Sequence, residues 1–325
     1  MENVNNFYAN NRKNKNNKHI HFFRMDMNMV RFGVELSELV YPGCDAPSPL
    51  VKVMTRGGGA IQKPFFVAFE GEGNLYISIR GMAEVSDFFF CAKFERAPLA
   101  GGCAHKGILE GARWIIEQLR SNIDNCTGKI ICCGHSMGGA TAGMICAVLT
   151  LEEKRENVFS ISMAPFPILD HNLSSQLIGK SVSFVFRNDV VPRLDSKNLG
   201  LLIRTFIPPG ATPQQVGIML QPLIQQLISG FAMANGYDQN SMYNLSGEIP
   251  KIIEMLTNIA SNQSQENEFE LPGKAYYLDY KDGCPICQPY TDSQKMINIA
   301  GLLTGISDHS GELYQDVIFG IDELE

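Results

Sequence analysis

The sequence predicts an α/β protein whose mostly parallel central sheet is covered by helices on both faces. Three apolar runs, at residues 129–133, 158–163 and 182–186, read as buried strands, and helix-like segments come before and after the first of them. Near-continuous apolar strands of this kind are typical of parallel sheets. Hydrophobic residues make up 45% and charged residues 19% of the 325 residues, which is the composition of a globular protein with a full core.

The remaining elements follow in chain order. Apolar residues recur at helical spacing from Met25 to Tyr41, before Pro42. Residues 64–69 and 75–80 predict two strands joined by a hairpin-like connection, and residues 88–91 predict either a strand or an apolar loop. The other expected elements are helices at 107–119, 137–151 and 311–319 and a late strand at 273–280.

Two parts of the chain depart from this pattern. Residues 1–24 are rich in asparagine and lysine and predict a disordered tail, with contact between its basic residues and anionic lipid as the alternative. Residues 25–325 predict one domain, in which 193–272 form a mainly helical insertion between the later site residues. Residues 213–235 carry a broad apolar face there, which predicts either a lid over the site or a helix packed on the sheet.

Charge and cysteine content restrict the function class and the compartment. A formal net charge of -7 argues against nucleic acid as a partner. The nine cysteines are scattered, and no apolar signal segment begins the chain, so we expect a reducing, cytoplasmic location, with peripheral contact at membranes as an option. No apolar run is long enough to predict a transmembrane helix. Oligomeric state stays open.

The segment from Gly134 to Gly138 has the pattern G-x-S-x-G and predicts a nucleophile at Ser136. The pattern alone is weak, but here it follows an apolar strand and precedes a helix of small residues. Such a strand-turn-helix exposes the serine Oγ at a helix N-terminus, where the dipole favours negative charge. The main-chain N–H of Met137 then faces the position where an oxyanion forms.

A serine needs a base and an acid, and chain order selects them. Histidine titrates in the right range to accept the serine proton. In the α/β-hydrolase order of serine, acid, histidine, the base comes late, which selects His309 over the earlier histidines such as His105 and His171. His135, which precedes the serine on the turn, should point its side chain away from the reacting centre. The acid should follow a strand after the nucleophile, which favours Asp189, with Asp170 and Asp195 as rivals.

With these residues in view, the chain resembles the class 3 lipases, which include fungal triacylglycerol lipases and eukaryotic diacylglycerol lipases. Five motifs in the same order carry the resemblance across residues 65–320: Arg80-Gly81-Met82, Ala104-His105-Lys106-Gly107-Ile108, Gly134 to Gly139, Arg187 to Arg193, and Asp308-His309 with Tyr314. The resemblance implies an α/β-hydrolase fold and a catalytic triad of Ser136, Asp189 and His309. It also implies that Met82 joins Met137 in the oxyanion hole.

Two departures from the family pattern bear on activity. The family usually has threonine or serine where this chain has Met82, so a side-chain donor to the oxyanion is lost while the main-chain N–H remains. The long separation of Asp189 and His309, together with the strand at 273–280, is similar to the intracellular diacylglycerol lipase branch.

The expected function is a lipase that cleaves carboxylic esters of acylglycerols through an acyl-enzyme. The alternatives are a phospholipase or other carboxylesterase, and a catalytically weak lipid-binding homologue, which Met82 favours. The expected partners are a lipid ester and, transiently, a membrane or lipid-droplet surface. No cofactor or metal is expected, since Cys284-Pro285-Ile286-Cys287 has no second C-x-x-C to complete four ligands.

Overall fold

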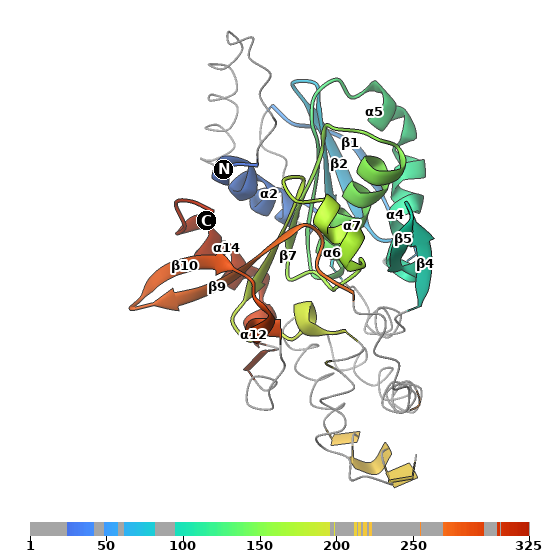
Figure 1. The fold of residues 1–325 in the computed structure, drawn as a ribbon. Helices are drawn as coiled ribbons and strands as arrows, with labels where there is room; N and C mark the ends of the chain where they lie inside the picture. The colour runs from blue at the N-terminus through green and yellow to red at the C-terminus, as the bar shows by residue number, and fades with distance from the viewer. Residues whose placement is uncertain are drawn as a thin grey trace.

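A sheet in the strand order β1-β2-β3-β6-β7-β8-β9-β10 forms the centre of the computed structural model (Figure 1). The described residues are 25–41, 49–57, 62–81, 95–195, 198, 211–212, 214–215, 217–219, 221–222, 254, 269–295, 304–305 and 307–324. The strands of this sheet are β1 (Val51–Arg56), β2 (Phe66–Gly71), β3 (Asn74–Ile79), β6 (Ile130–His135), β7 (Val158–Met163), β8 (Ser181–Phe186), β9 (Lys274–Lys281) and β10 (Cys284–Pro289).

The middle of the sheet is parallel and both its edges are antiparallel. Strands β3, β6, β7, β8 and β9 run parallel, whereas β1-β2-β3 and β9-β10 pair antiparallel. Strands β7 and β8 are buried along their whole length, as expected for strands covered on both faces. The prediction of a mostly parallel sheet flanked by helices is confirmed.

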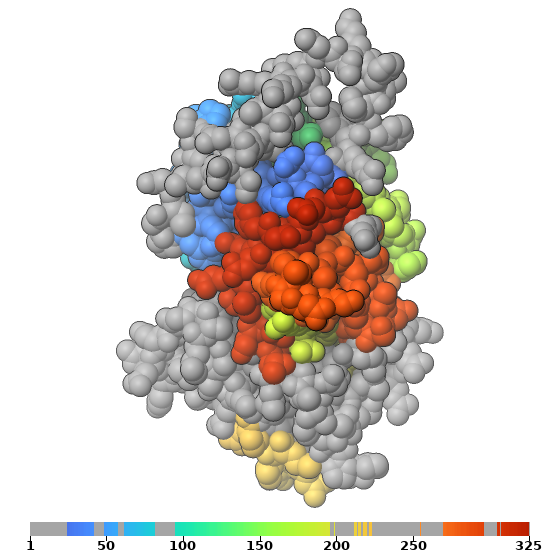
Figure 2. All heavy atoms as spheres, turned by 90° about the vertical axis from the view of Figure 1, so that its left-hand side faces the viewer, coloured from blue at the N-terminus to red at the C-terminus, as the bar shows by residue number. Residues whose placement is uncertain are grey.

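Helices cover the sheet in two layers, each with its own core. One core joins α4 (Lys106–Gln118), α5 (Arg120–Asn125) and α6 (Met137–Ala147) to one face of the sheet. The other joins α2 (Met27–Glu38) and α14 (Gly311–Phe319) to the opposite face. Figure 2 shows this second face, where the red and orange C-terminal segments lie beside the blue residues of α2. The first and last described helices therefore cover the same side.

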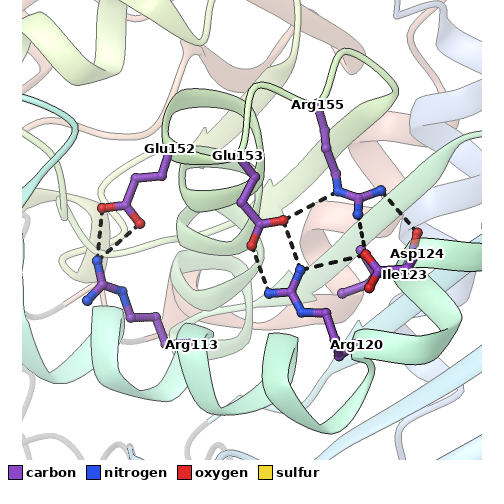
Figure 3. Close-up of polar contacts among 7 residues, drawn as sticks. All are labelled: Arg113, Arg120, Ile123, Asp124, Glu152, Glu153 and Arg155. Atoms are coloured by element: carbon purple, nitrogen blue, oxygen red, sulfur yellow. Dashed lines mark hydrogen bonds and ion pairs between the residues drawn. The ribbon is translucent and has the colours of Figure 1, made fainter.

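Three ion pairs tie the outer helices of the first face to the end of α6 (Figure 3). The helix α6 continues into a wider turn, η2 (Val148–Glu152). Beyond it, Arg120 bonds Glu153 at 2.8 Å and holds the pKa of that carboxyl below its usual value, while Arg113 bonds Glu152 at 2.9 Å. Arg155 pairs with Asp124 at the end of α5. An exposed ion pair contributes only about 0–1 kcal/mol to the free energy of unfolding. The network therefore orients these helices and adds little to the stability of the fold.

The described elements match most of the expected ones, with several additions. The structure adds β1, β10, the hairpin of β4 (Arg96–Leu99) and β5 (Gly102–His105), and the short helices α5, α7 (His171–Gln176) and α12 (Asp292–Lys295). Residues 88–91 lie outside the described residues, as do the tail at 1–24 and most of 193–272. The domain boundaries and the lid at 213–235 therefore stay predictions. No described helix is long and apolar enough to cross a membrane.

Candidate active site

Ser136 lies at the sharp turn between β6 and α6, with a left-handed φ of +58°. A non-glycine residue rarely adopts this conformation, so surrounding contacts must hold it. Its main-chain N–H donates to the carbonyl oxygen of Met163 in β7 at 2.9 Å, and its own carbonyl oxygen accepts from Ala140 at 3.0 Å. The strained turn is thus bonded on both sides and presents the serine at the carboxyl end of the parallel strands.

The two glycines of the motif are required by close contact with strand β3. A Cβ at Gly138 would overlap the carbonyl oxygen of Ile79, and one at Gly134 would lie 2.5 Å from the carbonyl carbon of Gly138. The end of β3 is therefore pressed directly against the nucleophile turn. The next residues along the chain are Arg80 and Gly81, which lead into the segment predicted to supply the oxyanion hole.

His309 bridges Ser136 and Asp189. Its Nε2 lies 3.0 Å from the Ser136 Oγ, and its Nδ1 lies 2.9 Å from Oδ2 and 3.0 Å from Oδ1 of Asp189. All three residues are buried. The structure therefore brings together the predicted nucleophile, base and acid in one chain of hydrogen bonds, although they are far apart in the sequence.

Asp189 is held by two further donors. The main-chain N–H of Val191 donates to its Oδ1 at 2.9 Å, and the Tyr314 hydroxyl donates to its Oδ2 at 2.6 Å. The same hydroxyl accepts from the main-chain N–H of Phe186 at 2.8 Å. Burial raises the pKa of Tyr314 well above its usual value, with the nearby Asp189 adding to the shift, so Tyr314 stays protonated as a donor.

The loops that carry Asp189 and His309 are also bonded to each other. The carboxylate of Asp308 accepts from the main-chain N–H of Asn188 at 3.0 Å, and burial raises its pKa. Arg193 is buried and donates to the main-chain oxygens of Arg187 and Gln294, at 2.6 Å each, and to that of Asp189. The bond between Asp308 and Asn188 links the two loops independently of the His309–Asp189 pair, and Arg193 ties the Asp189 loop to α12.

The rival residues lie elsewhere. His105 caps α4, where its Nδ1 accepts from Ile108 at 3.4 Å, and His171 pairs with Glu270. The carboxylate of Asp170 accepts from the main-chain N–H groups of Cys103 and Leu173, and that of Asp195 accepts from Asn198. These aspartates therefore serve as caps of local turns.

The predicted oxyanion hole is described only in part. Met137 is the first residue of α6, directly after Ser136, whereas Met82 lies outside the described residues. The neighbouring Gly81 is described. A Cβ at Gly81 would lie 3.7 Å from the Cβ of Ser136 and 3.5 Å from the Tyr41 hydroxyl, which hydrogen-bonds the main chain of Gly81. Tyr41 follows α2 and had no signal in the sequence, because only the fold brings it here.

Removal of the Tyr314 hydroxyl should impair the site without removing a triad residue. In Tyr314→Phe, Oδ2 of Asp189 and the N–H of Phe186 both lose a buried partner, at a cost of about 1–3 kcal/mol in unfolding free energy. We expect kcat to fall about tenfold with KM little changed. Denaturant unfolding and ester-hydrolysis kinetics measure the two effects. Tyr280→Phe, at a half-buried tyrosine of β9 that does not bond Asp189, is the control, and equal effects in both variants would contradict the assignment.

The described residues offer no group of three or more His, Cys, Asp or Glu side chains that could hold a metal ion. Cys284 and Cys287 are free thiols on the edge strand β10. Along a strand, positions three apart point to opposite faces, so this C-x-x-C does not direct its two sulfurs to one point.

The parallel sheet, the strained serine turn after β6 and the order serine, aspartate, histidine define an α/β-hydrolase. Residues 76–199 match the family model described as Lipase (class 3). This match agrees with the resemblance to the class 3 lipases that the motifs carry.

Solved structures share the fold at low identity. The native propeptide complex of Rhizomucor miehei lipase is 16% identical, with a TM-score of 0.50, over 87% of this chain and 78% of that one. A triacylglycerol lipase from Penicillium expansum is 12% identical, with a TM-score of 0.45, over 81% of this chain and 83% of that one. No match was found among curated proteins. At 16% identity, the likeness to the Rhizomucor miehei complex supports the fold alone.

Proposed function

We propose that this chain hydrolyses carboxylic esters of acylglycerols, with Ser136 as nucleophile, His309 as general base and Asp189 as its orienting acid. The observation that carries the proposal is the continuous hydrogen-bond chain from the Ser136 Oγ through His309 to Asp189. This arrangement is the one that acyl transfer to a serine requires. The match of residues 76–199 to the class 3 lipase model favours a lipid ester as the substrate.

In the proposed reaction, the Ser136 Oγ attacks the ester carbonyl carbon while His309 Nε2 accepts the hydroxyl proton. The tetrahedral intermediate collapses as the C–O bond breaks, and His309 returns the proton to the leaving alcohol. Water then attacks the acyl-enzyme and loses a proton to His309. The bond between the acyl carbon and the Ser136 Oγ breaks, His309 returns the proton to Oγ, and the carboxylic acid is released. We assign the two oxyanion donors to the main-chain N–H groups of Met137, at the start of α6, and of Met82.

Asp189 acts in this scheme by its hydrogen bonds. Its carboxylate holds the Nδ1–H of His309, which leaves Nε2 as the acceptor that faces Ser136. When the imidazole becomes positively charged, the buried carboxylate stabilises that charge. The donors on the far side of Asp189, from Val191 and Tyr314, keep the carboxylate in place during both steps.

The second candidate function is a lipid-binding homologue with little turnover, which the methionine at position 82 favours. Loss of one oxyanion donor costs about 10²–10³-fold in kcat in serine hydrolases. The described triad geometry favours turnover, since an inactive relative has no need to keep three buried polar groups in register.

Contact with a lipid surface and a cytoplasmic location form a further part of the proposal. Ile218 and Met219, in the helical part of the proposed lid, are 67% and 44% exposed. Exposed apolar side chains of this size are favourable at a membrane or lipid-droplet surface.

A substrate panel tests the proposed function directly. Purified protein is assayed on emulsified diacylglycerol and triacylglycerol, on phospholipid vesicles and on a soluble sugar ester, and a fluorophosphonate probe is added in parallel. We expect acylglycerols to be cleaved fastest and the probe to label one site. If the probe labels the protein but phospholipid or the sugar ester is cleaved fastest, that ester takes the place of acylglycerols as the proposed substrate. Absence of both labelling and turnover would support the lipid-binding alternative.

A further inference from the structure

His135, the residue before the nucleophile, lies against the ring of His309. It is the last residue of β6, where it pairs in register with Met163 of β7. Its ring centroid lies 4.6 Å from that of His309, with the planes tilted by 41°, and 5.9 Å from that of Tyr314. The sequence predicted that this side chain points away from the reacting centre. It does not bond Ser136, but it lies behind the imidazole that does.

A hydrogen bond adds to the ring contact. The imidazole of His135 hydrogen-bonds the main chain of His309. Its Nε2 is sealed from solvent and has no hydrogen-bond partner among the described residues, which assigns the bond to Nδ1. The start of α14 passes beside the ring, since a Cβ at Gly311 would lie 3.9 Å from its Cγ. One side chain from a central strand thus contacts both the ring and the backbone of His309.

The environment keeps His135 neutral. Burial, reinforced by the neighbouring His309, lowers the pKa of His135 to about 3, although Asp189 opposes the shift. The groups that face it are His309 from the loop before α14, Asp189 from the loop after β8, and Tyr314 of α14. A neutral neighbour does not oppose the positive charge that forms on His309 during acyl transfer, whereas a second imidazolium at this distance would.

A buried nitrogen without a partner is costly, so its retention calls for a compensating role. An apolar side chain of similar size at this position avoids that cost and fills the same space. The fold alone therefore does not require histidine at position 135. Histidine differs from such a side chain in its flat ring and its Nδ1 donor. Both of these features contact His309.

We infer that His135 is a positioning residue, which holds the imidazole of His309 in line between Asp189 and Ser136 through its ring contact and its bond to the His309 main chain. The inference rests on the proposed function for its effect on turnover. The predicted loss on removal of His135 is a loss of kcat with KM unchanged, because its side chain contacts the base. A misplacement of the order of 1 Å in such a base lowers turnover about 10²-fold.

Two variants separate the contributions. His135→Leu removes the ring, the donor and the unpartnered Nε2, and we expect kcat to fall about 10²-fold with an unchanged or higher Tm. His135→Asn keeps a donor near the Nδ1 position, and we expect it to recover kcat to within about tenfold of the parent. His105→Asn, which keeps a capping acceptor for α4, is the matched control and should leave kcat unchanged.

Three results would overturn the inference: kcat within twofold of the parent in His135→Leu, a Tm that falls together with kcat in that variant, or an asparagine variant no better than leucine. A readout independent of activity is the NMR signal of the His309 Nδ1–H, identified by its absence in His309→Ala. We expect it sharp in the parent and His135→Asn and broadened in His135→Leu. A parent that shows this signal but cleaves no ester would contradict the proposed function and leave the inference intact.

Discussion

Replacement of Ser136 by alanine is expected to lower kcat for acylglycerol hydrolysis by about 10⁶-fold, the size of effect that loss of a serine nucleophile has in triad enzymes. Only the Oγ is removed, and the small side chain that remains fits the strained turn. The variant should still hydrolyse the ester about 10³–10⁴-fold faster than the uncatalysed reaction in water, because the oxyanion donors and substrate binding remain. Steady-state kinetics on a diacylglycerol emulsion measure the loss, and probe labelling should disappear with it.

The control for this variant is Ser175→Ala. Ser175 is an exposed serine of α7, whose hydroxyl bonds only the carbonyl oxygen of Asn172 among the described residues. Its loss should leave kcat and probe labelling unchanged. If Ser136→Ala kept probe labelling and at least a tenth of parental turnover, another nucleophile would carry the reaction and the proposed function would need a different site.

Asp189→Asn is expected to lower kcat by about 10⁴-fold, with the fold retained. The amide is the same size as the carboxylate, but it has one acceptor where Asp189 uses two oxygens for four hydrogen bonds, to His309, Tyr314 and Val191. An amide N–H turned toward His309 stabilises the tautomer with its proton on Nε2, which cannot accept a proton from Ser136. The pH dependence of kcat and the unfolding free energy, measured together, separate this effect from a loss of structure.

Asp170→Asn provides the control and tests the main rival for the acid. Its carboxylate bonds main-chain N–H groups at the start of α7 and in β5, 2.9 Å from Leu173 and 2.5 Å from Cys103. Asparagine is a good N-cap, so we expect a stability loss below about 1 kcal/mol and kcat within twofold of the parent. A larger loss of kcat in Asp170→Asn than in Asp189→Asn would reverse the assignment of the acid.

The buried centre of the fold could be predicted because its strands and helices each bury a recognisable pattern. Strand β7 and helix α14 have the bounds that the sequence predicted, 158–163 and 311–319. Strand β1 had no such signal, because it lies on an edge and alternates little, with Val51 63% exposed. Strand β10 contains Pro285 and Pro289, which an edge strand tolerates. Because proline is rare in other strands, the sequence alone gave no indication of a strand here.

Chain order selected the three residues that the structure brings together, but it gave no distances. The hydrogen bonds of His309 depend on loops that follow β8 and precede α14, and the contact of Asp308 with Asn188 that joins them has no spacing pattern. Tyr41 and His135 were missed for the same reason. Their neighbours in space, Gly81 and His309, are distant in sequence, so no local periodicity could indicate them.

The separation of the site residues has a consequence for protein synthesis. His309 follows Ser136 by 173 residues. At a synthesis rate of about 5–20 residues per second, this distance corresponds to roughly 9–35 s on the ribosome. Throughout that interval the growing chain can form β6, α6 and the serine turn while the base of the proposed triad does not yet exist. Because His309 lies just before α14, the proposed triad can be completed only after α14 has docked beside α2.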